Sequence, residues 1–238
     1  MSRMYEMVKS FYKISLILLL ANFLFLIFKD IHNLDTNRYL AEHYISQGVK
    51  ETGSINLVTS VLYDYRALDT LGEATVLLTA AAALAFLVPA KKGVMLGTTF
   101  TMIVYETLIF MIPFLAVLGA YLICFGHLSS GGGFVGGVVL AIIPILLTII
   151  HSVEFSEYKI KPNNKSLLEN IGSINFILLG LLGIFTGSNF LANGQSSFSL
   201  GNPGELISAG LIPYLNIMIG FKVGAGLAKI FNSLIKEE

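Results

Sequence analysis

The sequence predicts an all-α polytopic membrane protein with about six transmembrane helices. Apolar residues make up 55% of the chain, charged residues only 13%, and the mean hydropathy is +0.76, whereas average soluble domains carry about 25% charged residues. The stretch from Thr107 to Val153 contains no Asp, Glu, Lys or Arg. A soluble domain cannot hide such a stretch, but two membrane helices joined by a compact turn can.

Six apolar stretches carry this prediction, and each has roughly the 20 residues that cross the hydrocarbon core at about 1.5 Å per residue. A bilayer offers backbone groups no water, so we expect each stretch to be a helix. The expected spans cover residues 11–28, 71–89, 104–124, 134–151, 168–188 and 206–228.

The Lys and Arg residues of the connecting segments indicate the orientation. With the amino terminus in the cytoplasm, ten of them lie inside and four outside, and Lys222 is left within a span. We therefore expect a multi-pass protein of the plasma membrane with both termini in the cytoplasm. The inner set is Arg3, Lys9, Lys13, Lys91, Lys92, Lys159, Lys161, Lys165, Lys229 and Lys236, and the outer set is Lys29, Arg38, Lys50 and Arg66.

The chain divides near Pro89-Ala90-Lys91-Lys92-Gly93 into two expected units. Residues 1–92 hold two spans and the external segment 29–70, and residues 100–238 hold four spans. Within the external segment, the apolar piece Ile55–Tyr63 predicts a short helix in the membrane interface. A strand-like plug is the alternative.

Composition also limits the function classes. The formal net charge of zero gives no indication of a nucleic-acid partner. The single cysteine, Cys124, excludes an internal disulfide and any all-cysteine metal or iron–sulfur site. No nucleophile–base pair or metal-ligand set stands out, so we expect no catalysis, no metal and no cofactor in this chain.

Ionisable groups in spans are costly, which makes them candidates for an ion path. Asp69 and Glu73 are four residues apart, so both carboxylates lie on one helix face, and Arg66 can pair with Asp69. Glu73 is the deeper carboxylate, where desolvation favours exchange of a proton or cation, and Thr75 adds a hydroxyl group. The second interpretation, which does not exclude the first, is capping by Asp69 or Thr70 with Glu73 on the helix dipole.

Three further ionisable residues each have two interpretations. Glu106 is either a carboxylate on the dipole of span three or part of an ion path shared with a neighbouring subunit. Lys222 either extends its amine to the cytoplasmic interface or lines that same path. His127 is either a hydrogen-bonded structural group or a functional one, and His151 lies at the opposite surface, too far away for a shared metal site.

The glycine-rich turn between spans three and four matches a dinucleotide fingerprint at Gly131-x-Gly133-x-x-Gly136. That match is rejected because the motif follows an apolar helix rather than a strand. The pairs Gly132/Gly136 and Gly133/Gly137 are spaced by four, which predicts the close approach of a partner helix.

The segment Tyr121–Ala141 resembles the signature of the MnhB/MrpB subunit of multisubunit Na+/H+ antiporters. That family reads G-H-x-x-P-G-G-G-F-x-G-G; here Gly126 begins the match and Ser130 replaces the proline. The segment Asp64–Glu73 resembles the D-x-R-x-x-D-T-L-G-E pattern at the carboxyl end of the large MrpA subunit. A separate MbhE-type subunit carries this pattern in archaeal membrane-bound hydrogenases.

The chain thus resembles an MbhE-type unit fused to an MrpB-type unit, an arrangement similar to that of the archaeal membrane-bound sulfane reductase. The resemblance implies a non-catalytic subunit of a module that moves Na+ and H+, with Arg66, Asp69 and Glu73 on positions linked with the ion path. It implies other Mrp-like antiporter subunits and a hydrogenase-like iron–sulfur module as partners. A [NiFe]-hydrogenase complex and a stand-alone Mrp antiporter are the other settings.

Two different functions stay open on the residues alone. One is a structural scaffold that seals the complex without touching an ion. The other is an autonomous secondary transporter, which six spans without an inverted repeat fit poorly.

Overall fold

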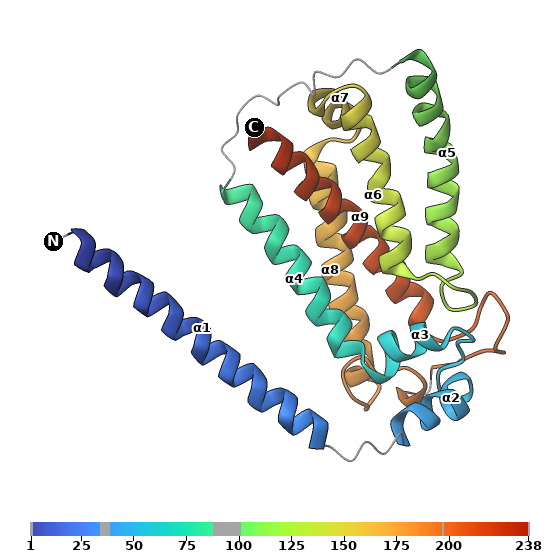
Figure 1. The fold of residues 1–238 in the computed structure, drawn as a ribbon. Coiled ribbons are helices and arrows are strands. Elements are labelled where there is room, and N and C mark those ends of the chain that lie inside the picture. The colour runs from blue at the N-terminus through green and yellow to red at the C-terminus, as the bar shows by residue number, and fades with distance from the viewer. Residues whose placement is uncertain (1, 34–38, 88–100, 197, 238) are drawn as a thin grey trace. The chain divides into compact units, whose positions relative to one another are not determined.

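The computed structural model describes residues 2–33, 39–87, 101–196 and 198–237, and the regular elements in these ranges are helices (Figure 1). The elements are α1 (Ser2–Asn33), α2 (Tyr39–Thr52), α3 (Leu57–Ser60), the π-helical turn η1 (Val61–Tyr65), α4 (Ala67–Leu87), α5 (Met102–Cys124), α6 (Gly133–Ile150), α7 (Val153–Lys159), α8 (Pro162–Phe185), the 3-10 turn η2 (Gly194–Ser196) and α9 (Ile212–Glu237).

Six of these helices, α1, α4, α5, α6, α8 and α9, are long and apolar enough to cross a membrane. This confirms the all-α polytopic class and the six expected spans. The chain forms two compact units, residues 1–42 and 43–238. In the first unit, α1 exposes its side chains all round from Phe11 to Phe28. A helix that is apolar over its whole circumference suits a lipid or helical environment.

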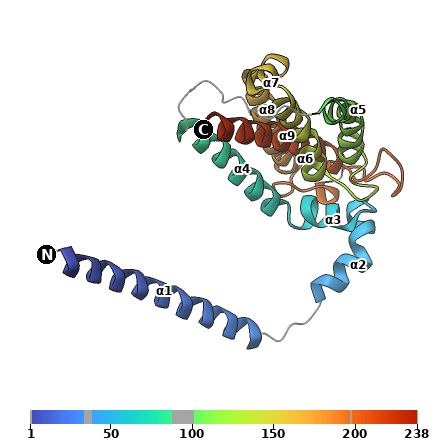
Figure 2. The ribbon, with the colours of Figure 1, turned by 45° about the horizontal axis from the view of Figure 1, so that its top comes forward.

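In the second unit, α9 is the central helix. It packs against α4, α5, α6 and α8, and Figures 1 and 2 show it running between α4, α6 and α8. Its buried face carries Ile212, Leu215, Ile219 and Val223 at helical spacing, and Phe176 of α8 joins the same core. Lipid tails are as apolar as these side chains, so close packing rather than the hydrophobic effect holds such helices together.

Glycines permit that packing. A Cβ added to Gly133 would lie 2.4 Å from the carbonyl oxygen of Asn216, and one added to Gly137 would lie 2.8 Å from Val223. Both neighbours belong to α9. A Cβ on Gly136 would instead lie 2.4 Å from Ile123 of α5. Glycines on the two faces of α6 therefore let α5 and α9 approach its backbone.

The start of the last span and the content of segment 39–65 differ from the sequence-based expectation. The expected span 206–228 in fact begins at Ile212, because Ala209 and Gly210 have positive φ angles of 65° and 57° that no helix accommodates. Segment 39–65 contains the unpredicted helix α2 as well as the expected short helix, which is built from α3 and η1 rather than as a strand.

Candidate functional site

The π-helical turn η1 leads into α4 and positions Arg66 beside Asp69. The backbone N–H of Arg66 donates to the carbonyl of Val61 at 2.8 Å, five residues back, and α4 begins one residue later. Nε of Arg66 donates to Oδ2 of Asp69 at 2.6 Å, and both side chains are exposed. The Thr70 hydroxyl donates to the Leu62 carbonyl at 2.5 Å and fixes the turn against the helix. Asp69 is thus an arginine partner in the first turn of α4, while Thr70 lies inside the helix rather than capping it.

The next turns of α4 carry exposed polar side chains on two sides of the helix: Thr75 and Thr79, four residues apart, share one side, and Glu73 lies on another. The side chains of Glu73, Thr75 and Thr79 are all exposed in the isolated chain. The Thr75 hydroxyl donates to the Leu71 carbonyl at 2.5 Å, and the Thr79 hydroxyl donates to the Thr75 carbonyl at 2.8 Å. Their oxygen lone pairs point away from those bonds and stay available as acceptors.

Asp64 lies in η1, directly before α4, and was not singled out from the sequence as a candidate. Its carboxylate accepts hydrogen bonds from the side-chain amides of Asn193 at 3.3 Å and Gln195 at 3.1 Å. Burial raises the pKa of Asp64 above its ordinary value; the two amide hydrogen bonds oppose that shift, and the negative charge of Glu51 adds to it. Only the fold brings η1 to η2, so the sequence held no local signal for this contact.

The glycine-rich turn between α5 and α6 is held by the segment before η1. Nδ2 of Asn56 donates to the carbonyls of Gly126 and Ser129, each at 2.8 Å. The Thr59 hydroxyl donates to the Gly126 carbonyl at 2.7 Å, and the Ser54 hydroxyl donates to the His127 carbonyl at 2.9 Å. We call these three donor side chains, Ser54, Asn56 and Thr59, the turn clamp. The clamp joins the amino-terminal part of the chain to the turn.

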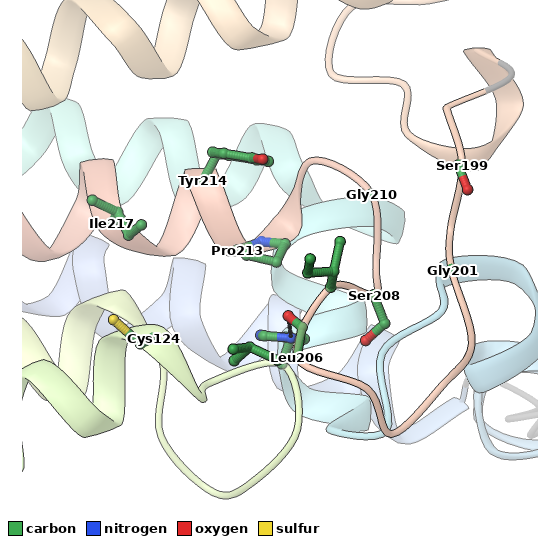
Figure 3. A pocket seen from close by; sticks show the side chains of 11 residues that line it. Cys124, Ser199, Gly201, Leu206, Ser208, Gly210, Pro213, Tyr214 and Ile217 are labelled. Atoms are coloured by element: carbon green, nitrogen blue, oxygen red, sulfur yellow. Dashed lines mark hydrogen bonds between the residues drawn. The ribbon is translucent and has the colours of Figure 1, made fainter.

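His127 is fully buried under the loop that follows α8. Its Nε2 atom lies 3.2 Å from the Leu206 carbonyl oxygen and donates to it, while Nδ1 has no hydrogen-bond partner among the described residues. Burial lowers the pKa of His127 below its ordinary value, opposed by backbone carbonyls at Leu206 and Glu205. The ring also borders a cavity of about 350 Å³ between the turn, this loop and the start of α9. Figure 3 shows Cys124, Ser208 and Tyr214 around that cavity.

A second polar contact fixes the start of α6. Gly132 occupies the N-cap position with φ of 122° and has no side chain to offer the helix. Oδ1 of Asn216, from α9, instead accepts a 2.9 Å hydrogen bond from the Gly133 backbone N–H. An N-cap oxygen normally comes from the helix's own first residues, so here the neighbouring helix supplies it.

A buried cluster of charges between α8 and α9 was not expected from the sequence. Nζ of Lys229 donates to Oε2 of Glu169 at 2.5 Å, and Glu169 is only 1% exposed. Lys222 and Lys165 are also buried, each 3% exposed. Lys165 and Lys229 were expected in connecting segments, so the sequence did not indicate a charge cluster between two spans. Glu169 falls inside the expected fifth span and was the available sign of a buried charge.

Two ionisable candidates from the sequence lie on α9 and α5. Lys222 lies near the middle of α9 rather than near the end of the span, because the helix runs about two turns further than expected. Its side chain is only 3% exposed and packs against α8 at Gly172. Glu106 is exposed near the start of α5. Within the described ranges, no three His, Cys, Asp or Glu side chains lie together as metal ligands.

These features define a polytopic helical membrane protein with ionisable groups buried between its spanning helices. Residues 103–229 match the family described as a domain related to the MnhB subunit of the Na+/H+ antiporter. Residues 17–93 match the MbhE family, described as one of the subunits of MBH. The chain belongs to the MnhB-related family, and the resemblance found in the sequence is confirmed.

Known relatives agree with this family. The uncharacterized protein MJ1307 of Methanocaldococcus jannaschii is 35% identical over 221 residues, which cover 79% of this chain and 82% of that protein. A chain of the membrane-bound sulfane sulfur reductase (MBS), an archaeal respiratory membrane complex, is 30% identical with a TM-score of 0.74; the match covers 97% of this chain and 100% of that one.

A second solved structure shares the fold alone. A chain of the Mrp complex from Dietzia sp. DQ12-45-1b is 22% identical with a TM-score of 0.63. The match covers 86% of this chain and 23% of that chain. The MnhB-related fold therefore occurs in membrane complexes of both the Mrp and the sulfane reductase kind.

Proposed function

We propose that this chain is a non-catalytic membrane subunit of an Mrp-type Na+/H+ antiporter module within a redox-driven respiratory complex. The match to the sulfane sulfur reductase chain over its full length supports that setting over a stand-alone antiporter. In this setting the chain lies in the plasma membrane with both termini inside. Other Mrp-like subunits and a hydrogenase-like iron–sulfur module are its partners, and Na+ and H+ are the ions moved.

The exposed carboxylate of Glu73 on α4 carries the proposal. Glu73, Thr75 and Thr79 are exposed on a helix that is apolar enough to span the membrane. A carboxylate facing lipid is costly, so polar groups on spanning helices face protein or a water-filled cavity. A neighbouring subunit therefore covers Glu73, and its carboxylate contributes to a cation path at that contact, while Thr75 and Thr79 lie on another side of α4.

The exposed cluster at the entrance of α4 fits the same path. The Arg66–Asp69 pair lies one turn before Glu73, and Asp64 lies in the same cavity wall as both members of the pair. Charged groups around the mouth of a narrow path raise the local concentration of the ion that enters it. The proposed route thus passes Asp64 and Asp69 before it reaches Glu73.

The deciding experiment isolates the native complex through a tag on this chain and compares Glu73→Gln with Glu154→Gln. Glu154 is an exposed carboxylate in the short helix α7, outside the spans, and serves as the control. We expect Glu73→Gln to reduce ion-coupled activity in membrane vesicles at least about tenfold, with normal subunit composition by mass spectrometry. The control keeps its activity.

Other outcomes point to other functions. Full activity of Glu73→Gln, with assembly lost instead on Gly136→Leu, would make the chain a scaffold that seals the complex without ion contact. Antiporter subunits that purify without iron–sulfur proteins would indicate a stand-alone Mrp antiporter. A chain that purifies alone and transports ions would be an autonomous transporter.

A further inference from the structure

The interface between α8 and α9 holds more positive than negative charge. Lys222 and Lys229 are seven residues apart on α9 and lie on one helix face with Gly226 between them. Glu169 of α8 faces this stripe: a Cβ added to Gly226 would lie 3.2 Å from its Oε1 atom. The carboxylate therefore sits at the level of Gly226, between the two lysines.

Glu169 uses its two oxygens differently. Oε2 accepts the 2.5 Å hydrogen bond from Lys229, and the buried Oε1 has no hydrogen-bond partner among the described residues. Buried polar atoms are nearly always paired, and an unpaired carboxylate oxygen is costly. The free oxygen thus marks a place where the interface is not fixed in a single hydrogen-bonded arrangement.

Lys222 is the second unusual charged residue of the α8–α9 interface. Its stem lies against α8, where a Cβ on Gly172 would be 3.0 Å from the Lys222 Cβ. Its electrostatic interaction is with Glu169, and no hydrogen bond to its amine is present among the described residues. A charged side chain that is 3% exposed and has one counter-charge is costly to bury.

The surrounding helices offer Lys222 no second counter-charge nearby. α6 has no charged residue, and α5 carries only Glu106, near its start. α4 carries Asp69 and Glu73 in its first two turns, and η1 carries Asp64. On α8, Lys165 lies one turn before Glu169; α7 carries Glu154, Glu157 and Lys159. Glu169 is the carboxylate that acts on Lys222.

We propose that Lys222 is a proton-exchanging amine in the ion path, with Glu169 as its counter-charge and Lys229 as the hydrogen-bonded partner of Glu169. In the exchange, an N–H bond of the Lys222 ammonium breaks, the electron pair stays on Nζ, and the proton passes to a water molecule of the path. Return of a proton from hydronium restores the ammonium. Glu169 stabilises the ammonium form of Lys222 when its free Oε1 faces that side chain. This inference rests on the proposed ion-translocating function and adds a proton site inside the chain.

The test applies one substitution to two lysines of the same helix face. Arginine keeps the positive charge but does not lose its proton in a protein. In the native complex we expect Lys222→Arg and Lys222→Met each to reduce ion-coupled activity at least about tenfold with normal assembly. Lys229→Arg keeps a charged partner for Glu169, so we expect it to lose less activity than Lys222→Arg, and an equal loss would contradict the different roles of the two lysines. Lys159→Met, an exposed site in α7, controls for the loss of a lysine.

The pH profile separates proton exchange from mere packing. In Glu169→Gln complexes that assemble, we expect the alkaline limb of the activity profile to move to lower pH, because the amine has lost the carboxylate that favours its ammonium form. Full activity of Lys222→Arg or Lys222→Met, or an unchanged profile in Glu169→Gln, would overturn the inference. Active Glu73→Gln with inactive Lys222→Arg would refute the α4 path but keep this site, and the reverse result would do the opposite.

Discussion

Asn216 of α9 caps helix α6 through Gly133, whose backbone N–H donates to the Asn216 side chain at 2.9 Å. The contact links the start of one spanning helix to the first turns of the central one. The Asn216 side chain is fully buried, and its Nδ2 atom lacks a partner among the described residues. The cap is therefore a buried hydrogen bond between two spanning helices.

Removal of this cap should destabilise the bundle. Asn216→Ala removes the 2.9 Å hydrogen bond that the buried Gly133 N–H donates, a loss of about 0.5–1.5 kcal/mol. We expect a lower midpoint of thermal unfolding for the purified complex. Asn170→Ala, at an exposed position of α8, should leave the midpoint unchanged; equal midpoints for the two variants would refute the capping role.

The turn clamp is the second target. Asn56 donates to two carbonyls of the turn, and its Oδ1 accepts from the backbone N–H of Val58 at 3.1 Å. Asn56→Ala removes these bonds at about 1 kcal/mol each, so the complex should unfold at lower temperature and be digested faster by protease. Val58→Ala changes an exposed neighbour and is the matched control. Protection equal to that of the control would contradict the clamp.

Two glycine substitutions should have opposite results. Gly136→Ala drives a methyl group to 2.4 Å from Ile123 and 2.8 Å from the Gly119 carbonyl oxygen. Such overpacking costs about 1–3 kcal/mol, and we expect less assembled complex in membranes. At Gly72, a Cβ meets no atom within 4 Å, so Gly72→Ala should preserve the chain's own fold, and helix propensity favours it by about 1 kcal/mol. Equal yields would show that α5 and α6 do not need this approach.

His127 should make stability depend on pH. Burial places its pKa in the folded chain below the ordinary value of 6.5, so the unfolded chain binds more protons between the two values. The contribution is present in full above about pH 6.5 and is lost as the pH falls toward the folded value. Unfolding midpoints measured from pH 7.5 to 5 should fall for the native complex and fall less for His127→Gln. Identical slopes would exclude His127 as the cause.

The spanning helices could be predicted because uncharged apolar stretches and the bilayer thickness leave few alternatives. The start of α9 could not, since it depends on positive φ angles at Ala209 and Gly210 that follow from the loop packing. The glycine spacing in α6 indicated close approach, but the partners Ile123 and Val223 are set by the tertiary fold.

The buried charges show a different limit. Lys222 could be named from the sequence, but its interaction with Glu169 and the pairing of Glu169 with Lys229 need two helices at a defined register. Asp64 likewise meets Asn193 and Gln195 only through the fold. Single residues could be named from the sequence, but the networks they join could not.

The turn clamp has an evolutionary consequence. Its acceptors at Gly126, His127 and Ser129 are backbone carbonyls, which every amino acid possesses. A mutation in the turn that preserves its backbone path leaves these bonds intact, so no compensating change is required at Ser54, Asn56 or Thr59. Covariation between the two segments should therefore be weak despite their contact, and methods that infer contacts from correlated substitutions would underestimate how firmly they are joined.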